Sequence, residues 1–179
     1  LAANMALRWA DAVYGENRFS QVLFQNAFGK SPQVITLGAD LWSDPGTDLL
    51  QQYDLQPNRY LLFVGLLKPD KGIDILIKAY EKLNTDIPLI IVGDSPDRGT
   101  YVEQLKSTPD KRIHFLGYVY GKAAQQLFAN AMIYIQPSLM EGNSPALMSA
   151  MACQRCVVVS DIDQNLETIG EAGLSFRSN

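Results

Sequence analysis

An amide and a hydroxyl side chain precede an apolar run in the segment "MEGNSPALMSAMA", residues 140–152. Pro145 suits the first position of a helix, and Ser144 suits the N-cap before it. The free N–H groups and the positive dipole end of such a helix favour an anion beside Asn143 and Ser144. The segment therefore predicts an anion site at the start of a helix.

Two charged residues would extend this site. Lys71 lies in the loop "GLLKPDKG", residues 65–72, and can bring an ammonium group to a bound phosphate. A carboxylate beside an anion site is costly unless it has another task, and Glu141 can accept hydrogen bonds from sugar hydroxyl groups. The pair indicates a phosphate-linked sugar. The alternatives are that Lys71 is an ordinary solvated lysine and that Glu141 interacts only with the helix dipole.

From about residue 58 onward, short β-branched and aromatic runs alternate with helical patterns. Strands are expected at 60–65, 87–94, 112–117, 132–138, 156–160 and 173–176. Helices are expected at 73–80, 122–131 and 145–153. Apolar strands joined by helices predict a doubly wound α/β domain with a parallel sheet of about six strands. Ligands bind at the carboxyl ends of such strands, so the candidate residues should share one rim.

Residues 1–45 do not follow that alternation and are interpreted as the tail of a preceding domain. Two helices and a strand are expected there, over residues 4–13, 21–30 and 33–41. The Pro, Gly and Asp residues of 46–57 are typical of a linker. Residues 58–179 form the α/β domain, which we expect to be truncated because the sequence stops just after the last expected strand.

Composition excludes several classes of function. The chain is 47% hydrophobic and 19% charged, with a net charge of −4 and no basic block, so a nucleic-acid partner is not expected. No stretch approaches the roughly 20 apolar residues of a membrane span, and the opening residues lack the pattern of a secretory signal. We therefore expect a cytoplasmic protein, with peripheral association at the inner face of a membrane through the preceding domain as a further option.

Cys153 and Cys156 form a C-x-x-C pattern, which in some folds is a redox pair with a lowered thiol pKa. Here the pattern joins the end of a helix to a strand instead of opening a helix, so two small packed thiols are the favoured interpretation. His114, the only histidine, is interpreted as an ordinary strand residue.

The motifs, taken in order, resemble those of a known family. They are "VG" after the first strand, a basic loop ending in "KG", then "IVGD", "FLGYV", "PS", "EG", "SD" and "ETIGEAGLSF". Over about residues 34–176 they resemble the C-terminal, donor-binding domain of the group one (family four) retaining glycosyltransferases, whose GT-B architecture has two facing Rossmann-like domains. "GYVYG" and "SPALMSAM" resemble a bacterial branch associated with rhamnosyl transfer in surface-polysaccharide assembly.

The resemblance implies transfer of a hexosyl or deoxyhexosyl group from a nucleotide-diphosphate sugar to an unknown carbohydrate or lipid-linked acceptor, with no cofactor and no metal. The implied catalytic residues are Lys71, which would hold the diphosphate, and Glu141, which would contact the sugar. Tyr118 and Val119 would receive the base, and Asn143 to Ala146 would offer backbone N–H groups to phosphate. The implied donor-binding residues are Lys68, Asn143, Ser144, Pro145, Ala146, Ser149, Tyr118 and Val119.

Two positions depart from the family pattern. Leu66 stands where the family usually has an arginine, which Lys68 would partly replace. Ser149 stands where a second glutamate usually contacts the ribose, and a serine is consistent with a thymidine-linked donor. These departures support a second hypothesis, a non-catalytic GT-B relative that serves as a binding or partner subunit. The resemblance implies that residues 1–45 are the tail of the acceptor-side domain, so on either hypothesis the isolated fragment is expected to be inactive in sugar transfer.

Overall fold

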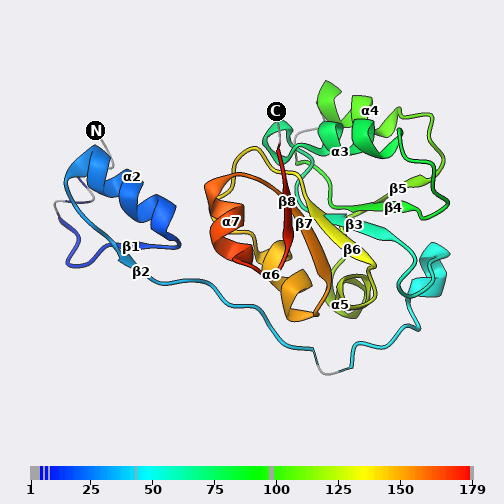
Figure 1. The fold of residues 1–179 in the computed structure, drawn as a ribbon, viewed down its shortest axis with the longest axis horizontal. Helices are drawn as coiled ribbons and strands as arrows, with labels where there is room; N and C mark the ends of the chain where they lie inside the picture. The colour runs from blue at the N-terminus through cyan, green and yellow to red at the C-terminus, as the bar shows by residue number, and fades with distance from the viewer. Residues whose placement is uncertain (1–4, 6, 8, 43, 97–98, 178–179) are drawn as a thin grey trace.

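The computed structural model describes residues 5, 7, 9–42, 44–96 and 99–177. It consists of a small N-terminal unit and a larger α/β domain, which an extended segment joins (Figure 1). Within the described residues, no helix has the length and apolar character needed to cross a bilayer.

Over residues 14–34, the N-terminal unit has one helix between two short parallel strands. The helix α2 (Arg18–Phe28) lies between β1 (Tyr14–Gly15) and β2 (Gln33–Val34). It begins earlier than expected because Asn17 caps it, with its side chain accepting a hydrogen bond from the Ser20 N–H at 2.7 Å. The strand expected over 33–41 is only two residues long. Part of the helix expected over 4–13 lies outside the described residues.

The domain contains a six-stranded parallel sheet, as the sequence predicted. Its strands are β3 (Leu61–Val64), β4 (Leu89–Val92), β5 (Ile113–Gly117), β6 (Ile133–Gln136), β7 (Cys156–Ser160) and β8 (Leu174–Phe176). The order across the sheet is β5-β4-β3-β6-β7-β8, the doubly wound order of a Rossmann-like domain. From β3 the chain adds strands first toward one edge of the sheet and then, from β6 onward, toward the other edge. Ligands of such sheets bind outside the carboxyl ends of the strands at this switch point.

Five α-helices and two 3₁₀ helices are described in the domain and its approach. They are η1 (Leu50–Tyr53), η2 (Pro69–Lys71), α3 (Ile73–Tyr80), α4 (Thr100–Lys106), α5 (Gly121–Ala129), α6 (Pro145–Ala152) and α7 (Asp163–Ile169). The sequence analysis assigned no helix at α4 or α7. Each has seven residues, too few to display a clear helical period.

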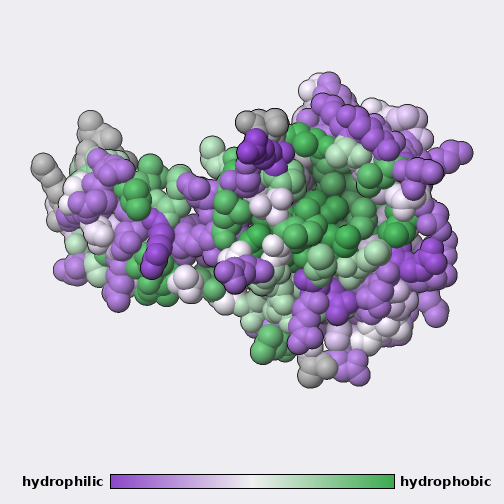
Figure 2. Space-filling view, viewed as in Figure 1, coloured by the Kyte–Doolittle hydropathy of each residue, from purple (hydrophilic) through white to green (hydrophobic). Residues whose placement is uncertain are grey.

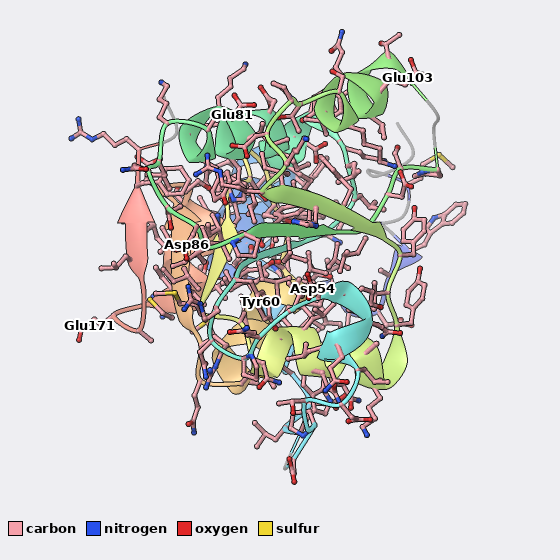
Figure 3. The ribbon with its side chains drawn as sticks, turned by 90° about the vertical axis from the view of Figure 1, so that its right-hand side faces the viewer. Asp54, Tyr60, Glu81, Asp86, Glu103 and Glu171 are labelled. Atoms are coloured by element: carbon pink, nitrogen blue, oxygen red, sulfur yellow. The ribbon has the colours of Figure 1, made fainter. Side chains whose placement is uncertain are left out.

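Helices cover both faces of the sheet. Apolar residues of α3 and α4 pack with one face, and residues of η1, α5, α6 and α7 pack with the other. Figure 3 shows this division: Glu81 and Glu103, at α3 and α4, lie on one side of the strands, and Asp54, after η1, lies on the other. Figure 2 shows apolar residues gathered on the surface over the sheet. A hollow beside α3 is lined by residues that include Leu61, Ile135 and Phe176.

The segment before the domain packs against α5. The fully buried side-chain amide of Gln126 donates a hydrogen bond to the carbonyl oxygen of Pro45 and accepts one from the N–H of Leu49, both at 2.7 Å. Leu50 is 1% exposed and belongs to the core. Part of the region expected to be a linker is therefore a packed element of the domain.

Gly72 sets the distance between the loops after β3 and β6. It adopts a left-handed conformation (φ +65°), and a Cβ atom there would overlap the carbonyl oxygen of Pro137. Beside this contact, the Asp70 carbonyl accepts a hydrogen bond from the Leu139 N–H at 2.8 Å. A glycine at this position lets the loop that carries Lys71 lie directly on the loop that carries Glu141.

We predict that Gly72→Ala lowers the free energy of unfolding by about 3 kcal/mol, because backbone strain adds to steric overlap. Gly121→Ala is the matched control, since Gly121 also has a positive φ (+60°) but nothing within 4 Å of its Cβ position. The control should lose only about 1–2 kcal/mol. Urea unfolding of both variants measures the difference, and equal losses would show that the approach to Pro137 contributes nothing.

Candidate functional site

Lys71 and Glu141 form an ion pair at the rim of the sheet. The Lys71 Nζ lies 2.7 Å from the Glu141 Oε2, and the two side chains are 21% and 7% exposed. Lys71 ends η2, which follows β3, and Glu141 lies in the loop after β6. The pair therefore lies at the switch point of the sheet. The structure thus brings together the two residues to which the sequence analysis gave the catalytic roles.

The second carboxylate oxygen of Glu141 is bound as well. Its Oε1 accepts hydrogen bonds from the side-chain amide of Gln136 at 2.6 Å and from the hydroxyl of Ser138 at 2.7 Å. A nearly buried carboxylate needs such partners, because an unpaired charge in this position would cost several kcal/mol. Glu141 is thus held in one orientation by Lys71, Gln136 and Ser138.

The helix α6 begins as the sequence predicted. The side chain of Ser144 accepts a hydrogen bond from the Leu147 N–H at 3.2 Å, and Pro145 occupies the first turn. Pro145 has no N–H group, so its backbone cannot take part in the phosphate binding implied for Asn143 to Ala146, and this expectation is corrected to the other three residues. The methyl group of Ala146 packs against the core.

Two tyrosines mark the loop after β5. Tyr118 and Tyr120 are 49% and 76% exposed, and their rings stack with centroids 6.1 Å apart and planes inclined by 15°. Val119, between them, packs against the core. Exposed aromatic faces suit a nucleobase. The sequence analysis included Tyr118 and Val119 and missed Tyr120, although the alternation "YVY" placed both rings on one side.

The two departures from the family pattern lie near the ion pair in the sequence. Leu66 is 39% exposed in the loop that leads to η2. Lys68 directly precedes η2, and Ser149 lies in the second turn of α6; both are partly exposed. These placements are compatible with donor contacts, and the roles of Lys68 and Ser149 stay predictions.

Glu141 also lines a groove of about 880 Å³ between the N-terminal unit and the domain. Asp161 and Asp163, on the same groove, form an Asp-x-Asp sequence, to which the sequence analysis assigned no role. Within the described residues, no group of three or more His, Cys, Asp or Glu side chains is arranged to hold a metal ion.

The N-terminal unit contacts the loop that carries Glu141. The side-chain amide of Asn17, which is 6% exposed, donates to the carbonyl oxygen of Gly142 at 2.5 Å. The Asn143 amide donates to the carbonyl oxygen of Glu16 at 3.4 Å. The sequence analysis missed Asn17, whose helix-capping pattern was the one available signal, because a contact across 125 residues leaves no local pattern.

The cysteines do not resemble a redox pair. Both thiols are free, Cys156 is exposed, and burial raises the pKa of the half-buried Cys153 thiol. A catalytic thiol requires the opposite shift. His114 is an exposed residue of β5 whose strand partner is Ile90.

Residues 58–179 match a family model described as "Glycosyl transferases group 1". Among curated relatives, O-antigen chain mannosyltransferase B of Escherichia coli is 33% identical over 132 residues, which cover 70% of this chain and 35% of the relative. D-rhamnosyltransferase WbpZ of Pseudomonas aeruginosa is 29% identical over 167 residues, which cover 88% of this chain and 43% of the relative. The chain thus spans less than half the length of either relative.

A solved structure has the same fold over nearly the whole chain. Anabaena Alr3699/HepE, crystallised in complex with UDP and glucose, superposes with a TM-score of 0.87 at 26% identity. The match covers 98% of this chain and 52% of the HepE chain. Such neighbours are GT-B glycosyltransferases, and the fold expected from the sequence is confirmed.

We predict that Lys71 and Glu141 are strongly coupled in stability. Lys71→Met should lower the free energy of unfolding by about 3 kcal/mol, because it leaves a buried carboxylate without its counter-ion. The double variant Lys71→Met/Glu141→Gln should lose less than the sum of the single losses, by at least about 1 kcal/mol. Urea unfolding of the four proteins completes the cycle. Losses that add up within about 0.5 kcal/mol would show that the ion pair contributes no coupling.

Proposed function

The chain belongs to the glycosyl transferases of group 1, and we propose that it is the donor-binding half of a retaining glycosyltransferase. The reaction moves a hexosyl or deoxyhexosyl group from a nucleotide-diphosphate sugar to an acceptor hydroxyl. The names of the relatives, an O-antigen chain mannosyltransferase and a D-rhamnosyltransferase, support a sugar acceptor in a bacterial surface polysaccharide or glycoconjugate. The UDP and glucose in the HepE complex support a nucleotide-sugar donor.

The ion pair between Lys71 and Glu141 is the observation that carries this proposal. It brings a cation and a carboxylate, 2.7 Å apart, to the switch point of the sheet. The carboxylate of Glu141 comes four residues before the start of α6 at Pro145. A nucleotide sugar needs both kinds of group, a cation for its diphosphate and an acceptor of hydrogen bonds for its sugar hydroxyls. A solvated surface lysine would not be held in this way by a buried carboxylate.

In the proposed reaction the protein acts through electrostatics and orientation. Lys71 and the N-terminal end of α6 stabilise the negative charge that grows on the departing diphosphate. Glu141 holds the sugar so that its anomeric carbon faces the acceptor. The acceptor hydroxyl attacks from the side on which the diphosphate leaves, and the configuration is retained. This scheme requires no metal, since Lys71 and the N-terminal end of α6 supply the positive charge that offsets the negative charge of the diphosphate.

A second candidate function is that of a non-catalytic partner subunit with the same fold. The observation that favours it is Leu66, an apolar side chain, 39% exposed, where the family usually has an arginine. One charge-assisted hydrogen bond to the diphosphate is worth about 1.5–3 kcal/mol. The loss of this bond lowers the affinity for the diphosphate, but Lys71 is still present to bind it. We therefore favour the enzyme.

A hydrolysis screen of the protein, as encoded in full by its gene, tests the proposal. Its substrates are the diphosphate sugars of uridine, guanosine, adenosine and thymidine. We expect release of free sugar from one of these donors. If no donor is hydrolysed while a nucleoside diphosphate still binds in calorimetry, the partner-subunit function is correct instead.

We predict that Lys71→Ala and Glu141→Gln have different effects on binding and turnover. Lys71→Ala should weaken binding of nucleoside diphosphate and of nucleotide sugar alike, because both contain the diphosphate. Glu141→Gln should leave nucleoside diphosphate affinity unchanged or slightly higher, since it releases Lys71 from its ion pair, and should lower kcat by about tenfold or more.

Lys78→Ala is the control, since Lys78 is a 72% exposed lysine paired with Asp74 on α3. It should change neither affinity nor turnover. Calorimetry and steady-state kinetics measure the two quantities. If Glu141→Gln loses diphosphate affinity as severely as Lys71→Ala, Glu141 orders the whole loop and the separate roles are wrong.

A further inference from the structure

A stripe of polar side chains runs along the central strand β6 toward the site. Tyr134 and Gln136 stand two residues apart on this strand, and Ser138 follows at the same spacing, so they share one face. All three are nearly or fully buried, with exposed fractions of 0%, 2% and 0%. A central strand of a parallel sheet usually carries apolar residues at such positions, as this strand does on its other face with Ile133 and Ile135. The polar stripe thus requires an explanation.

Hydrogen bonds link the stripe to Glu141. The Tyr134 hydroxyl donates to the Gln136 Oε1 at 2.6 Å, and the Gln136 Nε2 donates to the Glu141 Oε1 at 2.6 Å and to the Ser138 Oγ at 2.8 Å. The Ser144 hydroxyl, at the N-cap of α6, donates to the same Gln136 Oε1 at 3.3 Å. Every buried side-chain nitrogen and oxygen of the described residues has a partner.

The orientation of the Gln136 amide follows from these partners. An ionised carboxylate only accepts hydrogen bonds, so the NH₂ group must face Glu141. The carbonyl oxygen then receives the two hydroxyls of Tyr134 and Ser144. Burial, together with the negative charge of Glu141, raises the pKa of Tyr134, so this hydroxyl stays protonated and remains a donor. The Tyr134 hydroxyl also lies 3.4 Å from the carbonyl oxygen of Val64, but the shorter bond is the one to Gln136.

We propose that Gln136 is a positioning residue that fixes the carboxylate of Glu141 and couples it to the start of α6. The amide holds Oε1 of Glu141, which leaves Oε2 directed at Lys71, and its oxygen binds the serine that caps the helix. Gln136 itself, at 2% exposure, acts on the donor only through Glu141. The effect on catalysis rests on the function proposed above, whereas the effect on the placement of Glu141 does not.

Crystal structures of the wild-type chain and of Gln136→Leu test the placement without any ligand. Leucine fills a similar volume but cannot donate a hydrogen bond, so we expect the carboxylate of Glu141 to turn away from the position 2.7 Å from Lys71. An unchanged Glu141 carboxylate in Gln136→Leu overturns the proposal. This comparison is valid even if the protein transfers no sugar.

Kinetics of the protein encoded in full by its gene test the consequence, with the nucleotide sugar that the hydrolysis screen identifies. Gln136→Leu should lower kcat about tenfold or more, with KM for the donor changed less than about threefold, since the misplaced group acts in the transition state. Gln126→Leu is the matched control, because Gln126 is also fully buried but its side chain binds Pro45, Asp48 and Leu49, none of which belongs to the network of Gln136. It should lower stability and leave kcat unchanged.

The pH profile of Gln136→Glu separates positioning from simple packing. This variant places a second carboxyl group against Glu141, with Lys71 and Tyr134 as the other titratable groups of the network. Two adjacent carboxylates raise one pKa of the pair, so a proton taken up at lower pH restores an O–H donor toward Glu141. The ratio of variant to wild-type kcat should therefore rise as the pH falls.

The ratio for Gln136→Leu should stay constant over the same range. A constant ratio for Gln136→Glu, or a loss of kcat in Gln126→Leu equal to that in Gln136→Leu, overturns the positioning role. If the wild-type protein hydrolyses no nucleotide sugar but Glu141 moves in the Gln136→Leu crystal, the positioning role stands and the proposed function fails.

Discussion

The ion pair of Lys71 and Glu141 is the interaction on which the rest of the site depends. Two charges with side chains only 21% and 7% exposed are stable only when they meet closely and when their remaining hydrogen-bonding capacity is met. The first condition requires the loops after β3 and β6 to touch, which Gly72 permits at Pro137. The second requires polar side chains beneath the carboxylate, and Gln136 and Ser138 supply them. A glycine, a glutamine and a serine in the interior thus follow from one electrostatic requirement.

The pair also connects the two sides of the groove. Glu141 is followed by Gly142, whose carbonyl oxygen accepts a hydrogen bond from Asn17 of the N-terminal unit. On its other side the Glu141 carboxylate is bound to β6 through Gln136. The loop is therefore fixed both from the sheet and from the N-terminal unit. A displacement of either one moves the carboxylate relative to the groove that it lines.

The sequence predicted the parallel sheet, the Ser144 cap and the shared rim of Lys71 and Glu141, because each has a local pattern: apolar runs, a serine before a proline, and polar residues just after strands. It did not predict that the lysine and the glutamate bind each other. That contact depends on how two distant loops pack. It also gave Gln136 no role, because "MIYIQPS" has the composition of an ordinary buried strand. What the sequence missed consists of contacts between residues far apart in the fold or of polar residues hidden within apolar runs.

Under the proposed function, Glu141 has two successive tasks. Without donor, its carboxylate neutralises Lys71 and acts as an internal substitute for phosphate. When a diphosphate arrives, Lys71 exchanges one anion for another, so part of the binding free energy is spent on breaking the pair. The carboxylate released from Lys71 stays attached to Gln136 and Ser138 through its other oxygen. It is thus already oriented, with one free oxygen, when the sugar hydroxyls of the same donor reach it. Diphosphate binding in this way frees a carboxylate oxygen of Glu141 to accept hydrogen bonds from the sugar. The binding of the diphosphate and the binding of the sugar thus become coupled.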